Sequence, residues 1–384
     1  MFKRTVQAAL FVIAVASMLV PYSCQNVVAA GEEETYNLYF GDLHTHTSYS
    51  DGVLTPWDAF EAAKAAGADF MATTDHVHYP YGKISLTQKL WEDTLDAAEF
   101  YTSEDFVAMA GYELWLPWIG EVNVYDTTTV YRDEGNPGGH GFNNGLHEAF
   151  HEVLPSLYDW LAETGAIGQW NHPTYWYGPY DRGFNESPMA NFFDFAYYSE
   201  YRDQGMSVLE NLENPDYEMS YIMALDAGWH IMPAANSDTH SANWISGSEL
   251  RTVLLAPSLT PENLYDAMRA SRGYATQDAN LRITYTLNGE VMGSVLSSPE
   301  SSYAADVHIE DPDGTASDEI TLVEIISDGG QVVASVPTGG TSVDLTLTLS
   351  SESAHYFYVR VTTASNLSGE VGVTAWTAPV WTGN

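Results

Sequence analysis

Histidine and carboxylate side chains recur at short spacings in the chain, and the most informative group begins at His44. His44 and His46 are two residues apart, and Asp51 follows five residues later. Because residues two apart on a strand point to the same face, both imidazoles would lie on one side, with Asp51 in the loop beyond. Two imidazoles and a carboxylate are typical ligands of zinc and related metals. The spacing therefore predicts a metal site at the end of a strand.

Four later segments place the same kinds of side chain after apolar runs. They contain Asp75 and His76, Glu113, His172, and Asp238 with His240. Each segment alone is weak evidence, but five in one domain are hard to explain as core packing. Histidine and carboxylate ligands without cysteine suit Zn, Mn or Fe, all of which support hydroxide chemistry.

Residues 36–280 supply alternating elements that could position these side chains. Strands are predicted at 37–46, 70–76, 106–113, 166–172, 207–213 and 230–240, and helices at 55–67, 86–101, 156–163, 217–227 and 260–272. Thr55 is the expected N-cap of the first helix, followed by Pro56. This alternation predicts an α/β domain with a largely parallel sheet. In barrel-like α/β folds the carboxyl ends of the strands carry the active site.

The pattern changes after residue 280. Short strand-like runs at 281–287, 304–309, 321–326, 331–336, 343–349 and 355–362 are separated by turns rich in Gly, Ser and Asp. Such spacing is typical of an all-β sandwich. The predicted organisation is a signal peptide at 1–30, an α/β domain at 31–279 and a β-sandwich at 280–384.

The N-terminal segment has the features of a cleavable signal peptide. Lys3 and Arg4 precede an apolar run at 8–20 that is too short to span a bilayer, and a small-residue cleavage site precedes Gly31. The one cysteine, Cys24, lies in this segment, and residues 21–23 make a poor lipobox. We therefore expect a secreted or periplasmic protein, with no lipid anchor and no transmembrane span.

The charge balance excludes one class of partner. The chain has 52 acidic and 13 basic residues, with a net charge of -39. A protein of this charge does not bind nucleic acid through a basic footprint. Without Cys24 the mature chain has no cysteine, which excludes disulfides, thiolate metal sites and a cysteine nucleophile.

Taken together, these motifs resemble the polymerase and histidinol phosphatase (PHP) metallohydrolases. Within that group the chain is most similar to the secreted, carbaryl-hydrolase-like CehA/McbA branch, which carries a C-terminal β domain. The matching segments are 40–46, 50–52, 74–76, 111–113, 171–173 and 237–240, and residues 375–381 resemble the ending of that branch. The resemblance implies a distorted (β/α)7 barrel that holds two or three divalent metal ions.

The resemblance also implies a distribution of ligands. One metal would bind His44, His46, Glu113 and Asp238, and a second would bind Asp51, His76 and His240. Glu113 would bridge to a third site that includes His172, and Asp75 would orient an imidazole.

The chain departs from this pattern at one position. Relatives commonly have a histidine where Glu121 stands. Either Glu121 is itself a ligand, which we favour, or the third site is weakened. His140, in a Gly-rich loop, is a candidate replacement ligand.

A rival motif spans residues 147–151, which read His147-Glu148-Ala149-Phe150-His151 and match the H-E-x-x-H pattern of zinc proteases. The longer form of that motif fails because Leu154 and Leu157 stand where Gly and His are required. Pro155 is expected to cut the helix soon afterwards. We therefore favour an ordinary surface helix.

Aromatic residues flank two of the predicted ligands, Glu113 and His172. They are Trp115, Trp118, Trp170, Tyr175, Trp176, Tyr177 and Tyr180. They either pack in the core, which we favour, or form an apolar wall for an aromatic or sugar group. Arg182 follows in the same stretch and is a candidate catalytic residue that would clamp a phosphate or carboxylate.

The predicted function is a secreted metal-dependent hydrolase in which a hydroxide bridging two metals attacks phosphorus or a carbonyl carbon. The broad resemblance implies phosphoesters of small molecules as substrates, and the closer branch implies carbamates or aryl esters. A non-catalytic secreted binding module is the alternative of another class, but it predicts missing ligands, and the ligand types are present.

Overall fold

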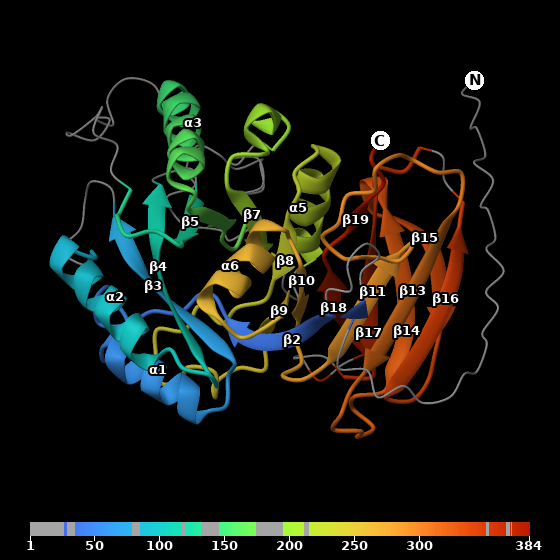
Figure 1. Cartoon of the computed structure of the whole chain (residues 1–384), viewed down its shortest axis with the longest axis horizontal. Helices are drawn as coiled ribbons and strands as arrows, with labels where there is room; N and C mark the ends of the chain where they lie inside the picture. The colour runs from blue at the N-terminus through green and yellow to red at the C-terminus, as the bar shows by residue number, and fades with distance from the viewer. Residues whose placement is uncertain are drawn as a thin grey trace.

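The structure is a computed structural model that describes residues 27–28, 35–78, 85–116, 120–131, 146–173, 195–210, 215–350, 353–365, 369 and 371–384. The predicted mixed α/β fold is confirmed, with one large sheet and few helices (Figure 1). Of the predicted signal segment only Val27–Val28 is described; it forms strand β1. Among the helices described, none has the length and apolarity that a membrane span requires.

The large sheet contains a run of seven strands, six of which point in the same direction. Its order includes β2 (Thr35–Asp42), β3 (Phe70–His78), β4 (Val107–Leu116), β5 (Gly120–Tyr125), β6 (Ile167–Trp170), β7 (Met206–Glu210) and β8 (Met232–Ala234). The pairs β2–β3, β3–β4, β6–β7 and β7–β8 are parallel, and β5 runs antiparallel between β4 and β6. The carboxyl ends of all but β5 therefore lie at the same edge.

The two ends of this run meet again just beyond β2 and β8. The amide of Asp238 donates to the carbonyl of His44 at 2.9 Å, and the amide of His46 donates to the carbonyl of Thr239 at 2.9 Å. These bonds bring the segment after β8 against the segment after β2. Closure of a complete (β/α)7 barrel stays a prediction.

The helices described are α1 (Pro56–Ala65), α2 (Gln88–Tyr101), α3 (Leu146–Thr164), α5 (Pro215–Asp226) and α6 (Pro261–Arg269), with short 3-10 turns η2 (Ser199–Tyr201) and η3 (Asp328–Gly330). Thr55 caps α1 as predicted and forms a capping box with Asp58. The buried face of α1 includes Phe60 and Ala63, which belong to the core cluster beside the sheet.

Helix α3 corrects one prediction. Pro155 lies inside the helix instead of ending it. A proline in a helix removes one backbone hydrogen bond and crowds the preceding turn. Here Leu154, Leu157 and Leu161 are fully buried, and this apolar stripe offsets the lost bond.

The C-terminal strands divide between two sheets. Strands β11 (Arg282–Leu287), β12 (Glu290–Val291), β13 (Tyr303–Glu310) and β16 (Ser342–Leu349) form a four-stranded sheet. Strands β14 (Ile320–Ser327), β15 (Gln331–Pro337), β17 (Tyr356–Thr363) and β18 (Gly372–Thr377) extend the large sheet, and β19 (Val380–Trp381) pairs with β17. Figure 1 shows most of these strands side by side, in orange and red.

The two sheets share a core. In β16 every second residue is buried, and the hydroxyl of Tyr285 in β11 donates to the carbonyl of Phe357 in β17 at 3.1 Å. The large sheet continues through β9 (Arg251–Ala256) and β10 (Gly273–Thr276) to β18, so hydrogen bonds cross the predicted boundary at residue 280. The sandwich architecture and the domain boundaries stay predictions.

Candidate metal centre

The nine predicted ligands come together at the carboxyl-end edge of the parallel strands. His44 and His46 follow β2, His76 lies in β3, Glu113 in β4 and Glu121 in β5, His172 follows β6, Asp238 and His240 follow β8, and Asp51 lies in the loop before α1. Because β5 runs the other way, Glu121 reaches this edge from the start of its strand. Residues far apart in the sequence thus meet because their strands end together.

Glu113 stands at the middle of the group and is 1% exposed. Its Oε1 lies 3.3 Å from His44 Nε2 and 3.4 Å from His172 Nε2. Its Oε2 lies 3.3 Å from His46 Nε2 and 2.9 Å from His76 Nδ1. Each carboxylate oxygen therefore faces two imidazoles, which is the arrangement a bridging ligand requires.

Donor atoms of His44, His46 and Asp238 form a first group, and the distances between them fit a small divalent ion. His44 Nε2 and His46 Nε2 are 3.2 Å apart, and Asp238 Oδ1 lies 3.3 Å and 3.0 Å from them. Ligand atoms about 2.1 Å from a tetrahedral zinc ion are separated by roughly 3.4 Å. With Glu113, these side chains supply a nitrogen and oxygen donor set suited to Zn, Mn or Fe.

A second group lies beside the first. Donor atoms of His46, Asp51, His76 and His240 all lie within 4.8 Å of one another. Asp51 Oδ1 is 3.1 Å from His240 Nε2, and the His240 ring stacks on His46. The side chains of Asp51 and His240 are 41% and 36% exposed, so this end of the centre is open to solvent.

A third group contains Glu121, which stands where the resemblance to PHP proteins implies a histidine. Glu121 Oε2 lies 3.1 Å from His172 Nε2, and donor atoms of His76, Glu113 and Glu121 fall within 4.8 Å of one another. Glu121 is 6% exposed. The geometry thus places Glu121 as a ligand would be placed, whereas His140 lies outside the described residues.

The charges of the centre are mutually dependent. Burial alone lowers the pKa of His44, but Asp238, Glu113 and Glu210 more than offset this and raise it well above its usual value. Burial alone raises the pKa of Glu113, but His44 and other imidazoles lower it well below its usual value. Without metal, Glu113 is stabilised by the surrounding imidazoles, and a divalent ion would take over that role.

Comparison with known proteins agrees with this arrangement. The PHP domain family matches residues 42–209, which carry seven of the nine ligands. No curated protein sequence matches the chain.

Several solved structures are similar to the chain at low sequence identity. A two-domain protein containing a predicted PHP-like metal-dependent phosphoesterase, from Bacteroides vulgatus, is 14% identical, with a TM-score of 0.45 over 95% of this chain and 100% of that one. PsfC from Pseudomonas syringae is 16% identical, with a TM-score of 0.38 over 62% and 89%. Histidinol phosphate phosphatase from Lactococcus lactis, in complex with zinc, L-histidinol and phosphate, is 16% identical, with a TM-score of 0.30 over 52% and 86%.

Just beyond the PHP-domain match, Glu210 is a residue that the sequence analysis missed. It ends β7, is 2% exposed, and its Oε1 lies 2.8 Å from His44 Nδ1. Its Oε2 accepts a hydrogen bond from the His172 backbone amide at 2.7 Å. Because Nδ1 of His44 faces Glu210, its Nε2 is directed at the centre. Glu210 lies in the middle of the predicted strand 207–213, so its position gave no signal of this role.

One side-chain amide, that of Asn171, holds the Glu113 carboxylate, and Asn123 holds that amide in turn. Asn171 Nδ2 donates to Glu113 Oε1 at 2.7 Å and to Asn123 Oδ1 at 2.9 Å. Asn171 and Asn123 are both buried. Glu113 is therefore fixed in orientation by hydrogen bonds that need no metal.

Asp42 and Asp75 hold the loops that carry ligands. Asp42 accepts hydrogen bonds from the amides of His44 and Ser237, and burial raises its pKa to about 6. Asp75 was predicted to be catalytic or to orient an imidazole, and this stays a prediction. It accepts hydrogen bonds from the amides and hydroxyls of Thr47 and Ser50, and so holds the turn before Asp51.

Two predicted ligands have backbones in the left-handed region. The φ angle is 26° at His172 and 47° at Asp238. Residues other than glycine adopt such angles at an energetic cost and do so most often at functional sites. The hydrogen bonds to Glu210 and to the His44 carbonyl hold these two positions.

Other candidates fall elsewhere or outside the described residues. Trp170 is fully buried and packs against Phe195 and Trp229, which confirms core packing for this member of the aromatic cluster. Trp118, the aromatic residues at 175–180 and Arg182 lie outside the described residues, and Trp115 is half-buried. The H-E-x-x-H segment lies in α3, and its side chains are likewise outside the described part of the chain.

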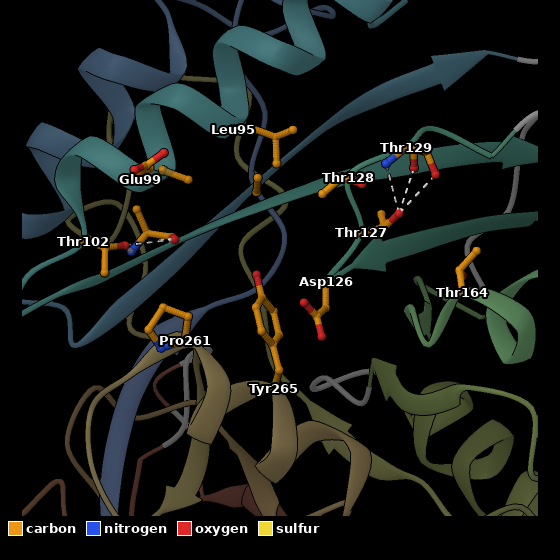
Figure 2. A pocket seen from close by; sticks show the side chains of 13 residues that line it. Leu95, Glu99, Thr102, Asp126, Thr127, Thr128, Thr129, Thr164, Pro261 and Tyr265 are labelled. Carbon is orange, nitrogen blue, oxygen red and sulfur yellow. Dashed lines mark hydrogen bonds between the residues drawn. The ribbon is translucent and has the colours of Figure 1, made fainter.

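A surface pocket of about 700 Å³ lies away from the metal centre. Figure 2 shows it between α2, the turn after β5 and α6, with Asp126 and Tyr265 side by side. None of the nine ligands lines it. The pocket therefore adds nothing to the centre.

Proposed function

We propose that the chain is a metal-dependent hydrolase that cleaves phosphoesters of small molecules. The observation that carries the proposal is the position of Glu113, whose two oxygens each face two imidazoles. A carboxylate in this position would supply one oxygen to each of two neighbouring divalent ions. When bound, divalent ions at such a site lower the pKa of water and stabilise negative charge that develops on a substrate oxygen.

The residues of the chain have separate tasks in this proposal. His44, His46 and Asp238 hold one ion, and Asp51, His76 and His240 hold a second at the open end. His172 and Glu121, with Glu113, hold a third. Glu210 and Asn171 fix the orientation of His44 and Glu113, so the ligands are positioned before an ion binds.

Carbamates or aryl esters are the second candidate substrates. The observation in their favour is the net charge of -39, because a strongly negative surface slows the approach of anionic phosphoesters. Predicted features that would complete this proposal are a signal peptide and secretion, membership of the CehA/McbA branch, and a closed (β/α)7 barrel followed by a β-sandwich.

The test is a substrate panel with purified full-length protein loaded with Zn or Mn. Nitrophenyl phosphate, bis(nitrophenyl) phosphate, a nitrophenyl carbamate and nitrophenyl acetate are offered to loaded and chelator-treated samples. We expect metal-dependent release of nitrophenol from one of the phosphoesters. Activity confined to the carbamate or acetate would select the second candidate, and no metal-dependent activity on any member would refute the hydrolase.

Three glutamate variants accompany this experiment. Glu113→Gln removes the bridging charge and should abolish the activity, whereas the exposed Glu104→Gln should leave it unchanged. Glu148→Gln tests the rival protease motif in α3. Loss of activity in Glu148→Gln with retention in Glu113→Gln would reverse the assignment.

A further inference from the structure

A second cluster of carboxylates lies apart from the metal centre. Asp278, Asp311 and Asp318 each place a carboxylate oxygen within 4.8 Å of the others. Asp278 lies in the segment that leads from β10 to β11, and the other two lie between β13 and β14. Both segments cross from one sheet to the other, so the cluster joins the two crossings.

Asp311 has a buried oxygen that lacks a partner. The residue is 3% exposed, and its Oδ1 accepts a hydrogen bond from the Asp313 amide at 3.0 Å. Its Oδ2 is buried and has no hydrogen-bond partner within the described part of the chain. The side-chain oxygen of Asn280, in the other crossing, is also buried without a partner there. Buried acceptors left in this state cost free energy.

The charges around Asp311 increase that cost. Burial is the largest effect on its pKa, which is raised to about 7, and Asp278, Asp318 and Asp313 raise it further. Arg251 acts on Asp278 electrostatically, but its guanidinium donates to backbone carbonyls at 245, 248 and 250. A positive charge inside the cluster would remove the repulsion among the carboxylates.

The donor set selects the kind of cation. The cluster offers oxygen atoms only, with no imidazole, whereas Zn and its relatives favour nitrogen or sulfur ligands. Calcium takes oxygen ligands, carboxylates above all, and tolerates flexible coordination geometry. Asp278 Oδ1 accepts from the amides of Asn280 and Leu281, which leaves its second oxygen for an ion.

We propose that Asp278, Asp311 and Asp318 bind a calcium ion that ties together the two crossings between the sheets. Asp318 Oδ2 accepts two hydrogen bonds from Thr315, whereas Oδ1 accepts one from Ser317 and retains a lone pair for an ion. The site is structural: bound calcium stabilises the packing of the four-stranded sheet on the large sheet. It does not depend on the proposed hydrolase.

The experiment measures calcium binding by the full chain loaded with zinc. Equilibrium dialysis against CaCl₂, with elemental analysis, should give one calcium per wild-type chain. Asp311→Asn should weaken that binding at least tenfold. The exposed Asp105→Asn is the matched control, and Glu113→Gln reports on the metal centre. Both should bind calcium as the wild type does.

Thermal unfolding supplies a second readout. Calcium at saturating concentration should raise the Tm of the wild type by about 2–5 °C, and equimolar MgCl₂ by less. Without calcium, Asp311→Asn should melt as high as the wild type or higher, because it removes a buried charge. With calcium, the wild type should have the higher Tm of the two.

Three results would overturn the proposal. The first is a wild-type chain that binds no calcium at millimolar concentration. The second is unchanged calcium binding in both Asp311→Asn and Asp318→Asn. Asp318 is half-buried, so its variant keeps the test decisive if Asp311→Asn does not fold. Loss of calcium in Glu113→Gln would assign the ion to the metal centre and also refute the proposal.

Discussion

Glu210 makes the sharpest prediction because it contacts the centre without being a ligand. Glu210→Gln keeps the size of the side chain and removes its charge. One oxygen of the carboxylate lies 2.8 Å from His44 Nδ1 and accepts a hydrogen bond from the side-chain amide of Asn236 at 3.0 Å. The other oxygen accepts a hydrogen bond from the backbone amide of His172 at 2.7 Å. An amide has one accepting atom, so one set of donors would face an NH₂ group.

The size of the effect follows from those contacts. A hydrogen bond to a charged group contributes about 1.5–3 kcal/mol. Loss of one such bond, at about 1.4 kcal/mol per factor of ten, predicts metal affinity weaker by roughly 10- to 100-fold. The same range is typical when the partner of a metal-binding histidine is removed.

The assay is competition for zinc between the protein and a fluorescent chelator. Glu104→Gln is the matched control, with the same chemical change on an exposed loop. The melting temperature of chelator-treated protein separates loss of affinity from loss of fold. Zinc affinity within twofold of the wild type, in a variant that is folded, would show that Glu210 does not position His44.

Three further predictions concern the same centre. Glu113→Gln should lower metal-dependent hydrolysis at least 1,000-fold, on the order of the loss of a group that acts in the transition state. Glu148→Gln should leave the rate of hydrolysis within twofold of the wild type. The reverse result would favour the protease motif. Glu121→Ala should lose one metal equivalent per chain by mass spectrometry, and unchanged content would exclude it as a ligand. Chelator-treated protein should lose stability as pH rises. His44 has a folded pKa raised above the usual 6.5, so its contribution is complete below pH 6.5 and disappears as pH rises through the raised value. Zinc should therefore raise the Tm more at pH 9 than at pH 6, and an equal shift would contradict this.

Local sequence patterns predicted the elements that carry strong signals. The cap at Thr55 and the strand that ends near His76 lie within a few residues of their predicted places. Strand β5 was missed, because its sequence Gly-Glu-Val-Asn-Val-Tyr mixes residues that disfavour strands with others that favour them. It exists because β4 and β6 provide hydrogen bonds on both sides.

The ligands were easier to predict than the residues that support them. Two histidines on one face at a strand end rarely serve packing alone, so His44 and His46 were accessible from the sequence. The role of Asp75 was not, because its partners Thr47 and Ser50 are common surface residues that turn toward its carboxylate only when the loop folds back. Glu210 contacts His44 across 166 positions of sequence, which no local pattern reports.

Burial, more than net charge, marks the acids that must find a partner, although Asp51 and Asp238 among the predicted ligands are not buried. Among the described residues, six carboxyl side chains are buried: Asp42, Asp75, Glu113, Glu121, Glu210 and Asp311. A buried carboxylate must find hydrogen bonds or positive charge, since its transfer from water is costly. Five of the six do so at one edge of the sheet, as ligands or as residues that hold ligand loops. Asp311 is the exception, because an oxygen of its carboxylate has no such partner among the described residues and its neighbours are acids. The same physical requirement that accounts for the metal centre therefore points to a second cation at the junction of the sheets.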